Sequence, residues 1–272
     1  MEWPAPQAAR FGMKYNQVQS NLRAWRPSEW VLFWGLVPAV LLGIYALPQG
    51  IRNDNLILNT LYPWRLQTWF LSSYTHSQLY PHLLGNLAFY FVTLLMIFAF
   101  ESDRRRFSLI ASLSFCVVPF ISSLLTVILW GAFGANTTGQ GFSAINGAFL
   151  AYAMFIMVVW GLQEILPVFD HPESFPGGRT HLRFSQVLLA FMVMLVMVMG
   201  LLTGLFTVAG GSVTNGIAHF GGYVTSLLVL FILDASTAKR RYFDTILGVS
   251  IFIGTVAYLY YLILIVQLVR GS

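Results

Sequence analysis

The sequence predicts an all-α protein, a bundle of helices that cross a membrane several times. The first observation is composition: hydrophobic residues make up 57% of the 272 residues and charged residues only 9%. Soluble domains carry about 25% charged residues, and the mean hydropathy here is +0.70. The second observation is that the apolar residues form long runs. Because about 20 helical residues cross the hydrocarbon of a bilayer, these runs are long enough to span it.

Seven such runs are present, given at the end of this paragraph. The alternation that a lipid-facing barrel strand requires is absent, so helices are the spanning structure that the sequence allows. Pro38 and Pro119 lie inside two of the runs and predict kinks that a helix bundle tolerates. The predicted spans are residues 30–47, 82–100, 107–132, 141–161, 184–207, 215–233 and 244–269.

The spans divide the chain into a cytoplasmic N-terminal segment (1–29), a six-helix core (30–233) and a linker with a seventh helix (234–272). The first segment lacks a cleavable signal pattern, so the first span is expected to be an uncleaved anchor. Trp25 and Trp30 suit the aromatic belt at a membrane surface. The long loop 48–81, with Tyr62, Trp64 and Trp69, is expected to lie in the outer interface at headgroup level.

Basic residues predict the orientation, because short loops rich in Lys and Arg stay in the cytoplasm. The expected arrangement is a multi-pass protein of the cell membrane with its N-terminus inside and its C-terminus outside. The net charge of +5 then reflects topology and contacts with anionic lipid, and no nucleic-acid partner is expected. Of the 15 basic residues, 12 fall in inner segments: Arg10, Lys14, Arg23, Arg26, Arg104, Arg105, Arg106, Arg179, Arg183, Lys239, Arg240 and Arg241. SDRRR at 102–106 has the pattern of a stop-transfer cluster.

Polar residues at the start of the second, fourth and sixth spans are the candidate functional residues. Ser143 follows the glycine-rich loop in the stretch TTGQGFSAINGAFLA (137–151), and His219 lies about one turn into the sixth span. His82 and Asn86 are four residues apart and share one helix face. Each residue alone is also explained by helix packing or interhelical hydrogen bonds. All three spans enter from the same side, however, so the four residues converge at one depth, where polar groups are costly unless they face a cavity.

This set permits nucleophilic catalysis on a carbonyl group. Ser143 is the candidate nucleophile and His219 the general base, later the acid. His82 and Asn86 are candidate donors to the oxyanion, together with backbone N–H groups at the start of the helix. No Asp or Glu lies within the predicted spans on this side of the membrane, so the sequence predicts a Ser–His dyad, without the acid of the full triad.

Small residues support the same arrangement. Two rows at four-residue spacing, given below, allow the fourth and sixth helices to approach closely, as a short serine side chain requires. Gly139 and Gly141 are expected to leave room for a substrate backbone. The two rows are Ser143, Gly147 and Ala151, and Ala218, Gly222 and Ser226.

Other classes fit the inventory less well. Two intramembrane carboxylates, a His-Glu-x-x-His motif and a lysine in the last span are all absent, which argues against an aspartyl protease, a zincin and a retinal protein. A metal site of His76, His82 and His219 stays open but lacks a carboxylate partner. No metal and no cofactor are expected. A small transporter would show an inverted repeat, which the sequence lacks.

The residues resemble the rhomboid intramembrane serine proteases. The match consists of Tyr62-Pro-Trp64-Arg65, His82-x-x-x-Asn86, Gly141-x-Ser143 and Ala218-His219-x-x-Gly222, in the family's order and on the same membrane side. The resemblance implies a six-helix core with one further C-terminal helix, a short central nucleophile helix and a water-filled cavity open to the outside. It also implies that the fifth helix and the loop before the sixth act as a gate.

Three departures from the family pattern matter. Ala144 follows the nucleophile where a glycine is usual, and Ser226 replaces a glycine of the sixth span. Gly147 stands where many members carry an aromatic residue that stacks on the histidine, which questions the support of His219. The expected function is an intramembrane serine endopeptidase that cleaves transmembrane segments of other proteins near the outer face. The alternative is a catalytically silent protein of the same fold that binds or escorts transmembrane clients.

Overall fold

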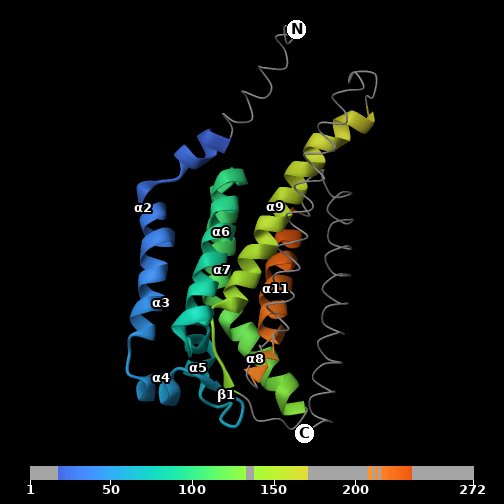
Figure 1. Ribbon diagram of the computed structural model, residues 1–272. Helices are drawn as coiled ribbons and strands as arrows, with labels where there is room; N and C mark the ends of the chain where they lie inside the picture. The colour runs from blue at the N-terminus through green and yellow to red at the C-terminus, as the bar shows by residue number, and fades with distance from the viewer. Residues whose placement is uncertain (1–17, 133–137, 171–207, 210–211, 214–215, 235–272) are drawn as a thin grey trace.

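The protein is a helical bundle, as the composition predicts. The computed structural model describes residues 18–132, 138–170, 208–209, 212–213 and 216–234. Figure 1 shows the long helices side by side, with their axes along roughly one direction. The polar loop structure gathers at one end of this bundle.

The first long helix runs from Pro27 to Tyr45 and lies at one edge of the bundle, drawn in blue in Figure 1. It consists of α2 (Pro27–Trp30), η1 (Val31–Leu36) and α3 (Val37–Tyr45), which follow one another without a break. The hydrogen bonds of η1 are π-helical. Pro38 has no backbone N–H to complete the α-helical ladder one turn before it, and the wider winding occurs at this point.

The second long helix combines η3 (Leu79–Leu83) and α6 (Leu84–Phe100) into one stretch of 22 residues. Buried side chains recur along α6 at three- and four-residue intervals, which gives the helix one continuous apolar face. They include Leu87, Tyr90, Leu94, Ile97 and Phe98.

The predicted span 107–132 is two helices, α7 (Arg104–Cys116) and α8 (Val118–Ala132), bent by 41°. Pro119 lies in the first turn of α8, where a missing N–H is tolerated, whereas inside a continuous helix it would remove a hydrogen bond. The predicted kink is therefore confirmed, but it is sharp enough to divide the span.

The central helix is α9 (Ser143–Asp170), and α11 (Gly216–Asp234) packs beside it. Nearly every side chain from Phe142 to Tyr152 is buried, as expected of a helix that is apolar all round. The sequence predicted that this helix ends near residue 161. It continues to Asp170, through Gly161 and Pro167.

The loop between the first two long helices folds into a compact group at the lower end of Figure 1. It contains α4 (Gln49–Asn55), β1 (Leu58–Asn59), α5 (Leu66–Leu71) and η2 (Ser72–Tyr74). β1 pairs antiparallel with β2 (Thr138–Gly139), with Leu58 opposite Gly139. We call this the loop end of the bundle, the end at which α6, α9 and α11 begin.

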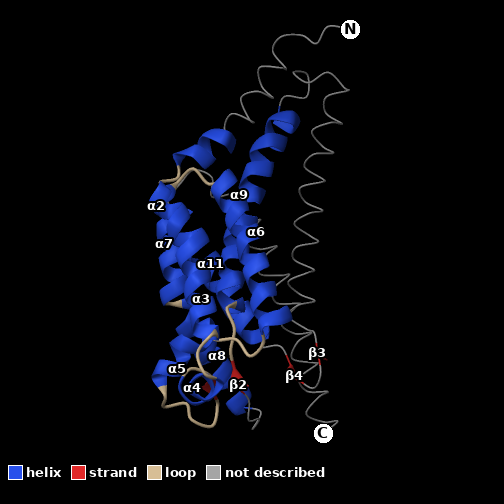
Figure 2. Cartoon of the chain, turned by 60° about the vertical axis from the view of Figure 1, so that its left-hand side comes forward, coloured by secondary structure: helices blue, strands red, loops and turns tan. Residues whose placement is uncertain are grey.

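Aromatic side chains of the loop differ in exposure. Trp64 is 69% exposed and Tyr62 42% exposed, which suits the predicted interfacial position. Trp69 is partly buried and its Nε1 donates a hydrogen bond to the carbonyl of Pro63 at 3.0 Å. A second short hairpin, β3 (Val208–Ala209) with β4 (Ser212–Val213), precedes α11 (Figure 2).

Trp25 corrects the prediction of a surface belt residue. It is 5% exposed, stacks on Phe98 with ring centroids 4.0 Å apart, and donates its Nε1–H to the carbonyl of Phe98 at 2.9 Å. Phe107 meets the same ring edge-on. The segment before the first long helix therefore packs into the core, because indole buries a large apolar surface once its N–H has a partner.

Two described helices, Pro27–Tyr45 and Leu79–Phe100, are long and apolar enough to cross a membrane, and a third results if the bent pair α7 and α8 counts as one span. The apolar stretches Ser143–Met157 and Ala218–Leu230 are shorter. The predicted spans 184–207 and 244–269, with the inner-loop residues His171 and His181, lie outside the described residues.

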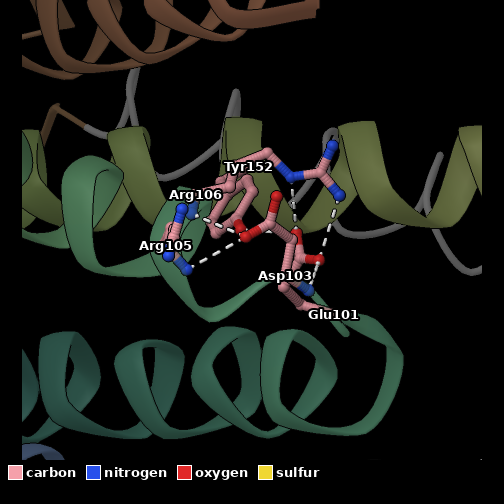
Figure 3. A network of polar contacts seen from close by, with 5 residues as sticks. All are labelled: Glu101, Asp103, Arg105, Arg106 and Tyr152. Carbon is pink, nitrogen blue, oxygen red and sulfur yellow. Dashed lines mark hydrogen bonds and ion pairs between the residues drawn. The ribbon is translucent and has the colours of Figure 1, made fainter.

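A polar network lies at the other end of the bundle, where α6 ends and α7 begins (Figure 3). Glu101 is 2% exposed and accepts two hydrogen bonds from Arg106, at 2.9 and 3.0 Å. Its carboxylate also accepts the hydroxyl of Tyr152 from α9. Asp103 caps α7 by accepting the N–H groups of Arg105 and Arg106. Arg106 of the predicted stop-transfer cluster thus forms an ion pair with the buried carboxylate of Glu101, just before the cluster.

Candidate functional site

Ser143 is the first residue of α9 and follows a tightly held loop. The N–H of Gly141 donates to the carbonyl of Ser72 at 2.9 Å, and Gly139 pairs with β1. Gly141 has φ +126°, a backbone conformation that only glycine adopts at low cost. These contacts fix where α9 begins, and hence where the Ser143 hydroxyl lies.

His82 lies against the same glycine. A Cβ built on Gly141 would be 2.7 Å from Nε2 of His82 and 3.8 Å from Oγ of Ser143, so the imidazole and the hydroxyl flank one residue. The space at Gly141 that the sequence suggested for a substrate backbone is therefore occupied by His82. Gly139 pairs with Leu58 through its backbone and lines a cavity beside Ser143.

His219 is brought to α9 by close contact between helix backbones. A Cβ on Gly147 would be 2.6 Å from the carbonyl oxygen of His219, and one on Gly222 would be 1.9 Å from the carbonyl oxygen of Ala144. The small residues thus allow the close approach that their spacing predicts. An aromatic side chain at Gly147 has no room here, because the backbone of α11 already lies there.

The His219 side chain is 7% exposed, and its Nδ1 is buried without a hydrogen-bond partner among the described residues. In the same part of the chain, no hydrogen bond joins the hydroxyl of Ser143 to His219. Catalytic hydrogen bonds are often long in the absence of substrate. The two groups nevertheless lie on adjacent helices: the backbone of His219 meets Gly147, which is about one turn along α9 from Ser143.

His76, which sequence analysis suggests only as a possible metal ligand, is part of the site. It is 1% exposed, and its Nε2 accepts the N–H of Phe142 at 3.2 Å. Its ring centroid lies 4.9 Å from that of His82, and its carbonyl accepts a hydrogen bond from Arg52 at 2.7 Å. Burial lowers the pKa of His76 to about 3, and the neighbouring His82 adds to this. His76 is therefore neutral at physiological pH and can accept the Phe142 bond.

Asn86 is connected to α9 by an amide that sequence reasoning did not single out. Nδ2 of Asn146 donates to the backbone carbonyl of Asn86 at 2.9 Å and to its Oδ1 at 3.0 Å. Nδ2 of Asn86 donates in turn to the carbonyl of His82 at 2.9 Å and lies 3.5 Å from Nε2 of His76. The only sequence signal was an asparagine in an apolar span, three residues after Ser143.

A small polar cavity lies beside Ser143, with an empty volume of about 280 Å³ including its open mouth. Most of its lining carries hydroxyl groups, so it suits water or a polar backbone better than an apolar side chain. Several of these hydroxyls are already bound to carbonyls, for example Ser123 to Trp69 at 2.7 Å. The lining includes Ser72, Ser73, Ser122, Ser123, Thr126, Gln140 and Ser143.

The structure thus brings Ser143, His82 and Asn86 together at the loop end, with His219 on the adjoining helix. Within the described ranges, no three His, Cys, Asp or Glu side chains are grouped closely enough to hold a metal ion. The alternative metal site of His76, His82 and His219 is not formed in this arrangement. Comparison of the chain with models of protein families, with curated proteins and with solved structures gives no match.

Proposed function

We propose that the protein is a serine endopeptidase of the rhomboid type, which cleaves transmembrane segments of other proteins within the bilayer. The observation that carries the proposal is the position of Ser143. Its hydroxyl lies at the first residue of a buried helix, beside a polar cavity and flanking the same glycine as an imidazole. A hydroxyl buried in an apolar bundle only for packing does not need histidines and asparagines directed to the same helix start.

In the proposed reaction, Oγ of Ser143 attacks the carbonyl carbon of the scissile peptide bond while its proton passes to His219. His82 and Asn86 donate hydrogen bonds to the oxyanion that forms. The C–N bond then breaks, and the leaving nitrogen takes the proton from His219. Water, activated by His219, hydrolyses the acyl ester and restores the serine. No metal or cofactor takes part in this scheme.

The proposed setting is a cell membrane, with seven spans, the N-terminus inside and the loop end facing outward. The exposure of Tyr62 and Trp64 at the loop end supports this, since such rings favour the headgroup region. So do exposed Arg23 and Arg26, which precede the first long helix, and exposed Arg105, which lies in the first turn of α7, just after the end of α6 that is opposite the loop end. Substrates are single membrane helices that unwind locally, and the lipid bilayer is the other partner.

One observation favours a second function, a catalytically silent protein that binds or escorts transmembrane clients. No hydrogen bond joins Ser143 to His219 in the part of the chain that the structure describes, and no aromatic ring supports the imidazole from position 147. A protein of this kind would keep the helix bundle and the client-facing surface. It would not need a reactive hydroxyl.

Cleavage of a single-span model substrate by the full chain in proteoliposomes tests the proposal. Wild type is compared with Ser143→Ala and His219→Ala, and a fluorophosphonate reports directly on the reactivity of Ser143. The proposal expects cleavage and labelling in wild type and neither in the two variants. Wild type that binds the substrate but shows no cleavage and no labelling at Ser143 would establish the silent client-binding function instead.

A further inference from the structure

Asn146 has a buried position that the proposed Ser–His chemistry does not explain. It is 3% exposed, on the central helix α9, three residues after Ser143. Polar amides inside an apolar bundle are costly unless they are hydrogen-bonded. Here the partner is one residue, Asn86 of α6, contacted at both its backbone carbonyl and its side chain.

The contacts determine which way both amides point. The backbone carbonyl of Asn86 can only accept a hydrogen bond, so the atom of Asn146 at 2.9 Å from it must be the NH2 group. The same NH2 lies 3.0 Å from the side chain of Asn86 and must therefore meet its oxygen. The other end of the Asn86 amide is then its NH2 group, which meets the carbonyl of His82 at 2.9 Å. Reversing either amide would place an acceptor against an acceptor.

One N–H of Asn86 remains after the bond to His82. The nearest acceptor, Nε2 of His76 at 3.5 Å, already receives the N–H of Phe142 at 3.2 Å. This N–H therefore lies beside His76, whose Nε2 holds the N–H of Phe142 next to Ser143, and it makes no short hydrogen bond of its own. Without Asn146, the Oδ1 of Asn86 loses the donor that holds it, and the bond to the His82 carbonyl is the contact left to orient the amide.

We propose that Asn146 is a positioning residue, which fixes the carboxamide of Asn86 so that its N–H group faces the oxyanion formed at Ser143. The inference rests on the proposed function. It adds Asn146 to the site. Ser143 and Asn146 share α9 and lie about 4.5 Å apart along its axis. The nucleophile and the orientation of the donor are thus fixed by the same helix.

The experiment measures acylation of Ser143 by a fluorophosphonate in the full chain. The rate is followed over a range of reagent concentrations, which gives the maximal rate constant and the apparent affinity for the reagent separately. Asn146→Leu keeps the side-chain volume in an apolar setting, and Asn146→Ala serves if the leucine variant does not fold. Asn86→Ala and the two double variants complete the cycle. Tyr152→Phe is the matched control, because it removes an interhelical hydrogen bond between the same helix and Glu101 at the other end.

We expect Asn146→Leu to lower the maximal acylation rate roughly 10-fold to 100-fold, with little change in the apparent affinity for the reagent. This decrease in rate should not exceed the decrease caused by losing an oxyanion donor. In the Asn86→Ala background the same change should alter the rate less than about 2-fold, because the group being positioned is gone. Tyr152→Phe should lower thermal stability and leave the rate unchanged.

Three results would overturn the inference, and they are distinguishable. If Asn86→Ala slows labelling but Asn146→Leu only lowers thermal stability, Asn146 is a packing residue and the proposed protease function stands. The same conclusion follows if Asn146→Leu slows labelling equally with and without Asn86. If wild type is folded and is not labelled at Ser143, the protease function fails and the role of Asn146 fails with it.

Discussion

Gly141 shows how a single backbone position controls the candidate site. Its φ of +126° is unfavourable for any residue with a side chain, and a Cβ would lie 2.7 Å from Nε2 of His82. The residue thus sets both the entry of the chain into α9 and the approach of His82 to Ser143.

Gly141→Ala should therefore remove activity and destabilise the protein by about 1–3 kcal/mol. The matched control is Gly85→Ala on the second long helix, where a Cβ would have nothing within 4 Å. Alanine is favoured over glycine in helices by about 1 kcal/mol, so the control should be neutral or stabilising. Thermal unfolding in detergent and fluorophosphonate labelling are measured for both variants. Equal stability and equal labelling of Gly141→Ala and Gly85→Ala would contradict the special role of Gly141.

His76 makes stability depend on pH. Its pKa is about 3 in the folded protein and about 6.5 when exposed, so the unfolded chain binds a proton that the folded chain excludes. The contribution is complete above about pH 6.5 and is lost as the pH falls toward 3. At pH 5 the difference of about 1.5 pKa units corresponds to about 2 kcal/mol.

The measurement compares thermal unfolding at pH 7 and pH 5 for wild type and His76→Gln. Glutamine can accept the N–H of Phe142 and does not titrate, so the variant should lose less stability on acidification than wild type does. His82, 4.9 Å away, is unchanged in both proteins and is controlled by the comparison. An identical loss in the two proteins would show that His76 is not the titrating group.

Chemistry-bearing residues could be predicted from the sequence only where the pattern itself was unusual. Ser143 follows a glycine-rich loop, and His82 and Asn86 share a helix face. All three residues could therefore be predicted as candidate site residues. His76 lies in an irregular loop whose fold depends on contacts with α9, and no periodicity places it. Asn146 looked like one polar residue in an apolar helix, and its partner is 60 residues away.

At the scale of helices, the contact between α9 and α11 depends on glycines at which the two backbones touch. Gly222→Ala should force the helices apart, because its Cβ would lie 1.9 Å from the carbonyl oxygen of Ala144. We expect a loss of at least about 3 kcal/mol of stability and loss of labelling at Ser143.

The adjacent residue provides the control. A Cβ on Gly221 would meet the end of the Leu125 side chain at 2.9 Å, and a flexible side chain can move aside. Gly221→Ala should change stability by less than about 1 kcal/mol. Thermal unfolding of the two variants decides the matter, and a milder effect at Gly222 than at Gly221 would contradict the described packing.

Helix positions were predictable because long apolar runs dominate the chain, and the first two spans agree with the structure within a few residues. Helix breaks were harder. Pro119 signalled a bend without revealing that the span divides at Val117, since the angle depends on how α8 packs. The N-terminal segment was assigned to the membrane surface because the sequence does not show that Trp25 has a carbonyl partner on α6.

At the scale of the whole molecule, the network around Glu101 joins three helices at the end opposite the candidate site. Glu101→Gln would leave Arg106 without its carboxylate partner and weaken the bond to Tyr152. Because Arg106 is only partly exposed, the expected cost is about 2–4 kcal/mol. The rate of fluorophosphonate labelling at temperatures where the variant is folded should stay at the wild-type value. A slower rate with unchanged stability would contradict this separation.

The two hydrogen-bonded links between α6 and α9 have a mechanical consequence. Asn146 meets Asn86 near one end of the pair, and Tyr152 meets Glu101 near the other. Hydrogen bonds at two points along the helix axes oppose both rotation and sliding of one helix against the other. The two helices therefore behave as one rigid unit. On the proposed function, the movement that admits a substrate helix from the lipid would then come from other helices, and the alignment of Ser143 with its donors would not depend on it.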